Sequence, residues 1–484
     1  MQRFNLRLIS LSILFSLITL QCLYAQGVVD ALRLSMPGTS SDARALGMGD
    51  SYIGLSDGAG AAEFNPAGWG LLNRMEVSGG IDYQNYNNNT NFLNQYTNYS
   101  NSATKLSNFS LALPFPTTQG SLVFAIAYHN TQDYTGALKF NGYNSGTSYG
   151  TMIQDLNATT NIPYDLYLTD TNFNTPINGH LNQSGTILET GSTNNWTFSG
   201  AIEVYKNLFL GLNLNIIAGS YENNNSYYEE DLNGYYANVQ TDPGTPATMG
   251  FQTFYLNKLL DWNISGWDAK FGLLYQLKDM ARFGITVQFP KTYTVKENFN
   301  VSGYSQFATG QSYNLDPTKY SDQVQYDIVT PFELGGGAAV NLQSLILSAQ
   351  ITFVDYTQLQ FQNASGLSAD YIASINQNIK DQLRAVVNYN LGAEYTLPGL
   401  GIRLRAGYFV QPSSYLNDPS KYDRKYYTLG LGYLADNSVG IDLAFAHGSW
   451  SNYGYNYNDQ YYVSPVTTQD ITTNKFILST TYRF

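Results

Sequence analysis

The chain has 484 residues, of which 12% are charged and 15% aromatic, with 41 tyrosines and a net charge of −12 at pH 7. The negative charge argues against a nucleic-acid partner, because phosphate groups require a basic surface. Beyond its N-terminus the sequence has no apolar run long enough for a transmembrane helix. A tyrosine-rich chain with few charges and no such run is typical of a membrane β-barrel, in which polar and apolar residues alternate.

Residues 1–25 have the pattern of a secretory signal peptide. Two arginines precede an apolar segment, Leu8–Leu20, and the expected cleavage site follows Ala25. The alternative is a lipoprotein signal at Cys22, which Gln21 fits poorly because that site requires a small preceding residue. Since cleavage removes the only cysteine, the exported chain is expected to use neither a disulfide nor thiol chemistry.

The segment Ala43–Gly68 is rich in small residues and in turn signals. Its glycines in Gly47-Met48-Gly49 let the backbone turn tightly and pack closely. In Asn65-Pro66-Ala67 the proline lacks an N–H and moves the preceding asparagine out of the helical region, so no regular element continues through it. These features predict a compact segment that fills a narrow space inside a larger structure.

The pattern Ala-Arg-Ala-x-Gly-Met-Gly, followed by Asn-Pro-Ala-Gly, resembles the N-terminal plug of the FadL/TodX/OmpP1 outer-membrane transporters. Over Ala43–Gly68 the resemblance is specific to the sequence motifs. Over the other residues it concerns only the barrel architecture. It implies an all-β fold, a 14-stranded antiparallel barrel (75–484) with a plug or hatch (26–74) in its lumen. It also implies a bacterial outer-membrane protein, a monomer in contact with membrane lipid, that transports long-chain fatty acids or aromatic hydrocarbons passively, without a cofactor or catalysis.

After this segment the hydrophobic pattern has a period of two, which predicts β-strands. In Leu208–Ala218 the apolar side chains fall on one face, and Gly211, Asn213 and Asn215 fall on the other. Fourteen segments of this kind have about the length that a tilted strand needs to cross a bilayer. They are Met75–Gln84, Leu106–Phe115, Gly120–Asn130, Trp196–Lys206, Leu208–Ser220, Gly266–Leu277, Ala281–Thr292, Thr330–Asn341, Ser344–Asp355, Ala385–Leu397, Gly401–Gln411, Tyr426–Leu434, Val439–Ser449 and Lys475–Phe484.

The connections between these segments alternate between short and long. Leu342–Gln343 is a short one, whereas Thr131–Asn195 and Tyr221–Ser265 are long. Bacterial barrels have short periplasmic turns and long external loops, and an even strand number places both barrel ends in the periplasm. We expect the long loops to fold over the barrel mouth, with disorder as the alternative. One loop holds an expected amphipathic helix, Ser368–Leu383, capped by Ser368 or Asp370 and packed on neighbouring loops.

Charged residues of the predicted strands lie opposite the apolar stripe. A charge that faces lipid at mid-membrane costs about 2–4 kcal/mol, whereas a wet lumen accepts it. Four lumen cations are candidates to bind the carboxylate of a ligand, since arginine offers paired donors. The alternative is that they pair with lumen acids such as Glu394 or Glu333, or with the plug. The four are Lys270, Arg282, Arg403 and Arg405.

No pattern in the sequence supports catalysis or metal binding. Residues 146–150, Gly-Thr-Ser-Tyr-Gly, match the nucleophile-elbow string, but they lie in a loop without the required strand and helix around Ser148. His129, His180 and His447 lack metal-ligand spacing. Gly335-Gly336-Gly337 lies inside a predicted strand and indicates a bend or close packing against the plug.

The resemblance implies a mechanism: capture by the loops, a lumen pocket, and lateral exit into lipid, which keeps an apolar solute out of water. In the family the lateral opening lies at a kink in the third strand, yet Gly120–Asn130 has no internal glycine or proline. Pro331 and the triple glycine are other candidate weak points. Two further hypotheses are an outer-membrane anchor for protein secretion or surface attachment, and a hydrolase in barrel form.

Overall fold

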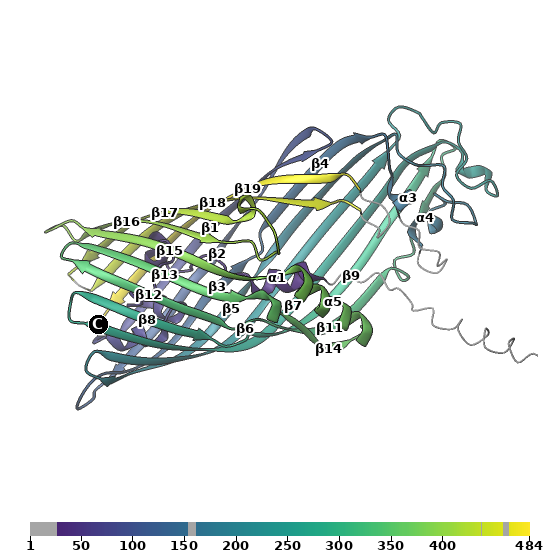
Figure 1. Ribbon diagram of the computed structural model, residues 1–484. Coiled ribbons are helices and arrows are strands. Elements are labelled where there is room, and N and C mark those ends of the chain that lie inside the picture. The colour runs from purple at the N-terminus through teal and green to yellow at the C-terminus, as the bar shows by residue number, and fades with distance from the viewer. Residues whose placement is uncertain (1–26, 153–160, 437, 458–463) are drawn as a thin grey trace, which may run out of the picture.

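The computed structural model describes residues 27–152, 161–436, 438–457 and 464–484, so the expected signal peptide and Cys22 lie outside the described residues. The chain forms one antiparallel sheet that closes into a barrel (Figure 1). Closure occurs at β1 (Glu76–Phe92), which pairs with β2 (Gln95–Phe115) on one side and with the last strand, β19 (Val466–Arg483), on the other.

The predicted fold class, a 14-stranded antiparallel barrel with an N-terminal plug, is confirmed. Within the described ranges, each of the fourteen predicted segments corresponds to one strand of the closed wall. Between β2 and β19 these strands are β3 (Leu122–Asp133), β5 (Leu181–Tyr205), β6 (Leu208–Glu230), β7 (Phe251–Leu277), β8 (Ala281–Gln288), β12 (Glu333–Leu342), β13 (Leu345–Asp355), β15 (Ala385–Thr396), β16 (Ile402–Gln411), β17 (Arg424–Ala435) and β18 (Val439–Tyr455).

Several segments predicted as loops are strands that extend the wall beyond the membrane. The longest strand, β7, has 27 residues, which at about 3.3 Å per residue is roughly 90 Å and well beyond a bilayer. The predicted loops Thr131–Asn195 and Tyr221–Ser265 therefore contain long parts of β5, β6 and β7. The wall outside the membrane also includes β4 (Gly136–Asn144), β9 (Thr292–Phe307), β10 (Ser312–Asn314), β11 (Ser321–Val329) and β14 (Gln360–Ser365).

The two faces of the membrane strands differ as the alternation predicts. On β6, Leu212, Leu214 and Ile216 are 46%, 52% and 56% exposed, whereas Asn213 and Asn215 are buried toward the lumen. Exposed aromatic residues form two bands, as at the two interfaces of outer-membrane barrels. The outer band contains Trp196, Trp267, Phe289, Phe332, Tyr389 and Tyr427, and the inner band contains Phe115, Tyr205, Tyr275, Tyr395, Tyr433 and Tyr482.

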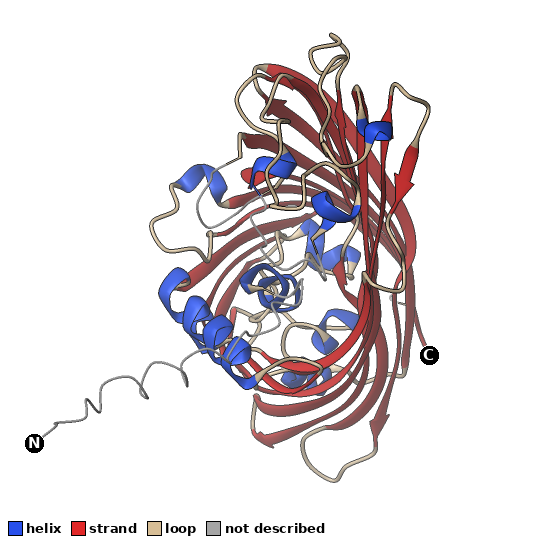
Figure 2. Ribbon diagram, turned by 90° about the vertical axis from the view of Figure 1, so that its right-hand side faces the viewer, coloured by secondary structure: helices blue, strands red, loops and turns tan. Residues whose placement is uncertain are grey.

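The N-terminal segment lies inside the barrel, where Figure 2 shows short helices surrounded by strands. It contains α1 (Val28–Ser35), α2 (Ala43–Gly47) and the 3-10 helices η1 (Ala59–Ala62) and η2 (Pro66–Leu71). None of the helices in the described ranges is long and apolar enough to cross a membrane. Short helices outside this segment are α3 (Tyr149–Met152), α4 (Ile162–Asp165), η3 (Pro246–Thr248), η4 (Tyr356–Gln358) and η5 (Ser420–Tyr422).

Two hydrophobic cores lie toward the extracellular end of the lumen. One joins α1 to the wall and to α5 (Ala369–Gln382), the expected amphipathic helix, which buries Ile375 and Ile379. Its cap is Ser368, whose side chain accepts a hydrogen bond from the Tyr371 N–H, so the helix prediction is confirmed. The second core lies among the extracellular strands and loops and contains Phe92, Phe140, Tyr227, Phe254 and Phe307.

Candidate functional site

The Gly47-Met48-Gly49 motif of the plug passes directly against the backbone of β15 and β16. A Cβ added to Gly407 would overlap the Gly49 nitrogen, and one added to Gly392 would overlap the Met48 carbonyl. Gly49 itself has φ of 64°, a left-handed conformation that side chains disfavour. The motif therefore requires glycine both in the plug and in the wall.

The Asn65-Pro66-Ala67 motif fixes the other side of the plug to β6 and β7. The Asn65 side-chain amide donates to the Ile53 carbonyl in the plug and to the Leu273 carbonyl in β7, at 3.1 Å each. Its side-chain oxygen accepts from the Ala67 N–H at 3.1 Å, which caps η2. A Cβ on Gly211 of β6 would overlap the backbone of this motif. Close packing of the triple glycine is also confirmed, because Cβ atoms on Gly335 and Gly337 would press on Ile53.

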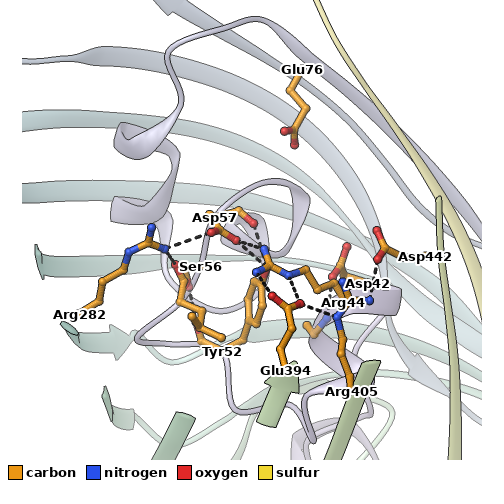
Figure 3. A network of polar contacts seen from close by, with 12 residues as sticks. Asp42, Arg44, Tyr52, Ser56, Asp57, Glu76, Arg282, Glu394, Arg405 and Asp442 are labelled. Carbon is orange, nitrogen blue, oxygen red and sulfur yellow. Dashed lines mark hydrogen bonds and ion pairs between the residues drawn. The ribbon is translucent and has the colours of Figure 1, made fainter. Parts of the chain in front are cut away.

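Charged side chains connect the plug to four wall strands in a buried network (Figure 3). From α2, Arg44 donates through Nε and Nη2 to the two oxygens of Glu394 on β15, at 2.9 Å each, and through Nη1 to Asp57 of the plug. Although burial opposes it, the guanidinium groups of Arg44 and Arg282 hold the pKa of Asp57 below its ordinary value. The plug is thus attached to the barrel wall by ion pairs as well as by backbone contacts.

The predicted ligand-binding cations lie in or near this contact zone. Arg405 bonds Glu394 and Asp442 at 2.6 Å each, and Arg282 bonds Asp57 and the Leu55 carbonyl at 3.1 Å each. Lys270 donates to the plug carbonyl of Glu63 at 2.6 Å. Arg403 borders a small cavity beside the plug and has no hydrogen bond or ion pair with the described part of the chain. Three of the four cations therefore contact the plug or lumen acids, which is the alternative considered from the sequence. A ligand-binding role for any of the four stays a prediction.

A cavity of about 660 Å³ lies in the lumen between the plug and the extracellular core. This volume is typical of small-molecule sites. Val29, Leu32 and Met36, which lie three or four residues apart on and just after α1, supply apolar lining. The Val29 side chain is 56% exposed, so α1 presents an apolar surface to the cavity.

Aromatic side chains from three strands line another part of the cavity. The Trp450 ring on β18 has its centroid 6.3 Å from Tyr86 of β1 and 6.2 Å from Tyr426 of β17. The guanidinium carbon of Arg424 lies 5.0 Å from the centroid of Trp450. Side-chain amides complete this polar and aromatic lining, among them Gln84, Gln411, Asn452 and Gln469.

The cavity reaches an irregular place in the wall, where β2 and β3 separate. Their pairing ends at Asn108 and His129, and the register between β3 and β5 shifts between Asn130 and Gln132. Above Asn108 no backbone ladder is recorded between the described strands and this edge of β2, which instead bonds β4 and β5 through side chains: Asn101 donates to the carbonyls of Gly136 and Glu189. The cavity lining includes residues 130–135. The sequence showed no kink signal in Gly120–Asn130, because a β-bulge needs neither glycine nor proline. Here the bulge is held by the plug, since the Gln132 side chain donates to the Met36 carbonyl.

Sequence reasoning missed the cavity residues because it ended their strands too early. Tyr86, Arg424 and Trp450 each lie one or two residues outside a predicted strand, in segments interpreted as loops. In the structure all three belong to the extended strands β1, β17 and β18. A signal was present, since alternation continues from Thr428 through Tyr426 to Arg424.

The serine and the histidines considered for catalysis or metal binding lie apart from one another. Ser148 is buried and its Oγ donates to the Ile177 carbonyl at 2.6 Å. His129 lies near Thr197, His180 stacks on Tyr235, and His447 contacts Asn474. Within the described ranges, no group of three or more His, Cys, Asp or Glu residues is arranged to hold a metal ion.

Comparison with known proteins places these features in context. The sequence model of the family described as "Outer membrane protein transport protein (OMPP1/FadL/TodX)" matches residues 27–484. A search of curated proteins found no match. The fold is similar to that of a FadL homologue from Pseudomonas aeruginosa, at 13% identity, covering 93% of this chain and 98% of that chain, with a TM-score of 0.57. It is also similar to the toluene transporter TodX from P. putida, at 14% identity, covering 92% and 99% respectively, with a TM-score of 0.55.

Proposed function

This chain belongs to the OMPP1/FadL/TodX family of outer membrane transport proteins, and from that premise we propose that it transports hydrophobic small molecules passively across the bacterial outer membrane. Long-chain fatty acids and aromatic hydrocarbons are the candidate substrates. The single observation that carries the proposal is the lumen cavity, which is bounded by α1 of the plug and reaches the place where β2 and β3 separate. No cofactor or energy source enters the proposal.

The route that fits this geometry is lateral. Along the barrel axis the cavity lies between the plug on the periplasmic side, to which we assign residues 26–74, and the second hydrophobic core on the extracellular side. A solute that leaves sideways emerges beside the outer aromatic band, where Tyr128 pairs with Trp196, and enters lipid at this interface. It thereby avoids re-exposing apolar surface to water, which costs about 25 cal/mol per Å². We propose that the barrel acts as a monomer and that outer-membrane lipid receives the solute.

The two other hypotheses have less support. An anchor for protein secretion or surface attachment needs a protein-binding outer surface, and the family description is that of a transport protein. A hydrolase needs an oriented nucleophile, and the loop around Ser148 follows β4 with only the four-residue helix α3 after it. We therefore propose transport without catalysis.

Uptake by bacterial cells tests this function. Cells that produce the barrel, and cells that lack it, are given radiolabelled toluene or radiolabelled palmitate, and the internal label is followed with time. We expect faster uptake of at least one compound when the barrel is present. Equal uptake of both compounds by both cell types, with the barrel folded in the outer membrane, would overturn the proposal. Native mass spectrometry that finds a bound protein partner and no lipid or hydrophobic compound would favour the anchor.

A further inference from the structure

Among the residues that the structure describes, one cation of the lumen cavity has no anionic partner. Three lysine and arginine side chains line the cavity: Arg33, Arg424 and Lys475. Arg33 is paired with Asp30 at 2.6 Å and Glu189 at 3.2 Å, and Lys475 is paired with Asp82 at 3.3 Å. Arg424 forms neither a hydrogen bond nor a salt bridge with any residue that the structure describes; its recorded contact is with the Trp450 ring.

The strand register places this guanidinium inside the barrel. Arg424 alternates with Tyr426 and Thr428, which are buried, and Thr428 donates to the plug carbonyl of Gly47 at 3.3 Å. The intervening residue Tyr427 is 59% exposed in the outer aromatic band. Arg424 therefore points into the lumen at the extracellular start of β17, where it lines the cavity together with Gln411, its cross-strand partner on β16.

Within the described residues, no acid of the cavity pairs with Arg424. Glu189 pairs with Arg33 and accepts from the Tyr221 hydroxyl, Asp133 pairs with Lys105 at 2.8 Å, and Asp418 accepts from the neutral Ser413 hydroxyl at 2.5 Å. Aromatic rings attract a guanidinium only through their quadrupole and do not neutralise its charge. A half-buried guanidinium beside them therefore retains a strong preference for an anion. Arg424 is therefore available to an anionic group of a ligand.

The rings next to Arg424 indicate what carries this anion. Tyr86, Tyr426 and Trp450 form a cluster of neighbouring rings within the cavity lining, a surface on which a planar ring can stack or pack edge to face. An aliphatic chain would gain less there, and it would also cover side-chain amides such as Gln84 and Gln411 without giving them hydrogen bonds. The lining thus combines the apolar surface of α1 with aromatic rings, hydrogen-bonding groups and the Arg424 guanidinium.

We propose that the cavity binds a planar aromatic molecule that carries a carboxylate, with the ring against Tyr86, Tyr426 and Trp450 and the acid group on Arg424. Guanidinium and carboxylate match in a two-point hydrogen-bonded pair. This inference rests on the proposed transport function and narrows its substrate class. Arg424 is the residue that distinguishes an aromatic acid from a neutral ring of the same shape.

Binding of three probes to the purified full barrel in detergent tests the inference. The probes are 2-naphthoate, its neutral isostere 2-naphthamide, and palmitate, and affinity is measured by titration calorimetry. We expect 2-naphthoate to bind about 10- to 100-fold more tightly than the amide, the range for hydrogen bonds to a charged group. Arg424→Gln should remove this preference and leave amide binding within about threefold, since the amide does not use the charge.

Two further variants control for folding and for general charge. Lys425→Gln removes a charge from the neighbouring position, which alternation places on the opposite face of β17, and should keep the preference. Arg424→Lys keeps the charge without the paired donors and should keep only part of it, so it also serves if Arg424→Gln does not fold. A naphthoate preference that survives in folded Arg424→Gln, or palmitate binding more tightly than naphthoate, would overturn the inference.

The same probes separate the two proposals. If the barrel transports toluene or palmitate but shows no preference for 2-naphthoate over 2-naphthamide, the aromatic-acid inference fails and the transport function stands. If the folded barrel neither binds any of the three probes nor increases uptake of toluene or palmitate, both proposals fail together.

Discussion

Neutralising Glu394 is expected to release the plug from the barrel wall. The carboxylate is 3% exposed and accepts three hydrogen bonds, two from Arg44 of the plug and one from Arg405 of β16. In Glu394→Gln the side-chain oxygen can keep the position that accepts from the Nε atoms of Arg44 and Arg405. The N–H₂ group then faces the Arg44 Nη2 donor, so that hydrogen bond and the carboxylate charge are lost.

The magnitude follows from these contacts. The lost charge-assisted hydrogen bond is worth about 1.5–3 kcal/mol, and removing one charged partner from a buried ion pair costs about 3–5 kcal/mol in all. Part of this free energy belongs to Arg405, which keeps Asp442 at 2.6 Å. Even about 3 kcal/mol shifts the equilibrium between docked and undocked plug by more than 100-fold.

Trypsin cleavage after Arg44 measures the undocked population, because the Arg44 side chain is 14% exposed in the docked plug. Mass spectrometry identifies the new end at Ala45. We expect cleavage of Glu394→Gln to be at least 100-fold faster than that of the parent, with the barrel strands intact. Asp279→Asn, in the exposed turn between β7 and β8, is the matched control and should cleave at the parental rate. Parental resistance in folded Glu394→Gln would refute the role assigned to the ion pairs.

Three further changes test the packing and charge arguments. Gly407→Ala puts a Cβ into the Gly49 backbone and should weaken plug docking by about 1–3 kcal/mol, measured with the trypsin assay. Gly336→Ala, which has open space around it, should leave docking unchanged. Equal effects of the two substitutions would contradict the close contact between Gly407 and the plug. Leu214→Lys on the lipid face should destabilise the folded barrel in liposomes by about 2–4 kcal/mol. Leu232→Lys, beyond the end of β6, should not destabilise it. Equal losses of stability would contradict the assignment of Leu214 to lipid and Leu232 to water. Because burial raises the pKa of Asp42 to about 6 from 3.8, its contribution to docking is complete below about pH 4 and lost as pH rises through 6. Cleavage at Arg44, normalised to a free peptide, should therefore accelerate from pH 5.5 to 8, and a slope unchanged in Asp42→Asn would contradict this assignment.

The sequence predicted the membrane part of the wall because lipid imposes a strict pattern on it. Along Leu208–Ala218 an apolar side chain is needed at each lipid-facing position, and the alternation is visible at once. Beyond the membrane the outer face contacts water, and that constraint disappears. Asn223, Asn224 and Asn225 have no alternation, yet they pair with β5 and β7 in the middle of long strands.

The candidate site was predictable only in part, because its contacts join residues that are far apart in the sequence. The Ala-Arg-Ala-x-Gly-Met-Gly pattern indicated the plug, and Glu394 was considered as a partner for lumen cations. The sequence around Arg44 or around Glu394 does not show that these two side chains form an ion pair. That contact spans 350 residues. Arg424 was not placed in the lumen, because the prediction ended its strand at Tyr426 although the alternation continues to Arg424.

Photo-crosslinking most directly tests whether a hydrophobic solute occupies the lumen on its way to the membrane. The purified barrel is incubated in lipid vesicles with a diazirine-bearing aromatic probe, irradiated and digested, and mass spectrometry locates the labelled residues. We expect label on Tyr86, Trp450 and residues 130–135, which line the cavity and its contact with β3, and competition by unlabelled probe. Label confined to lipid-facing residues such as Trp196 and Trp267, without competition, would contradict passage through the lumen.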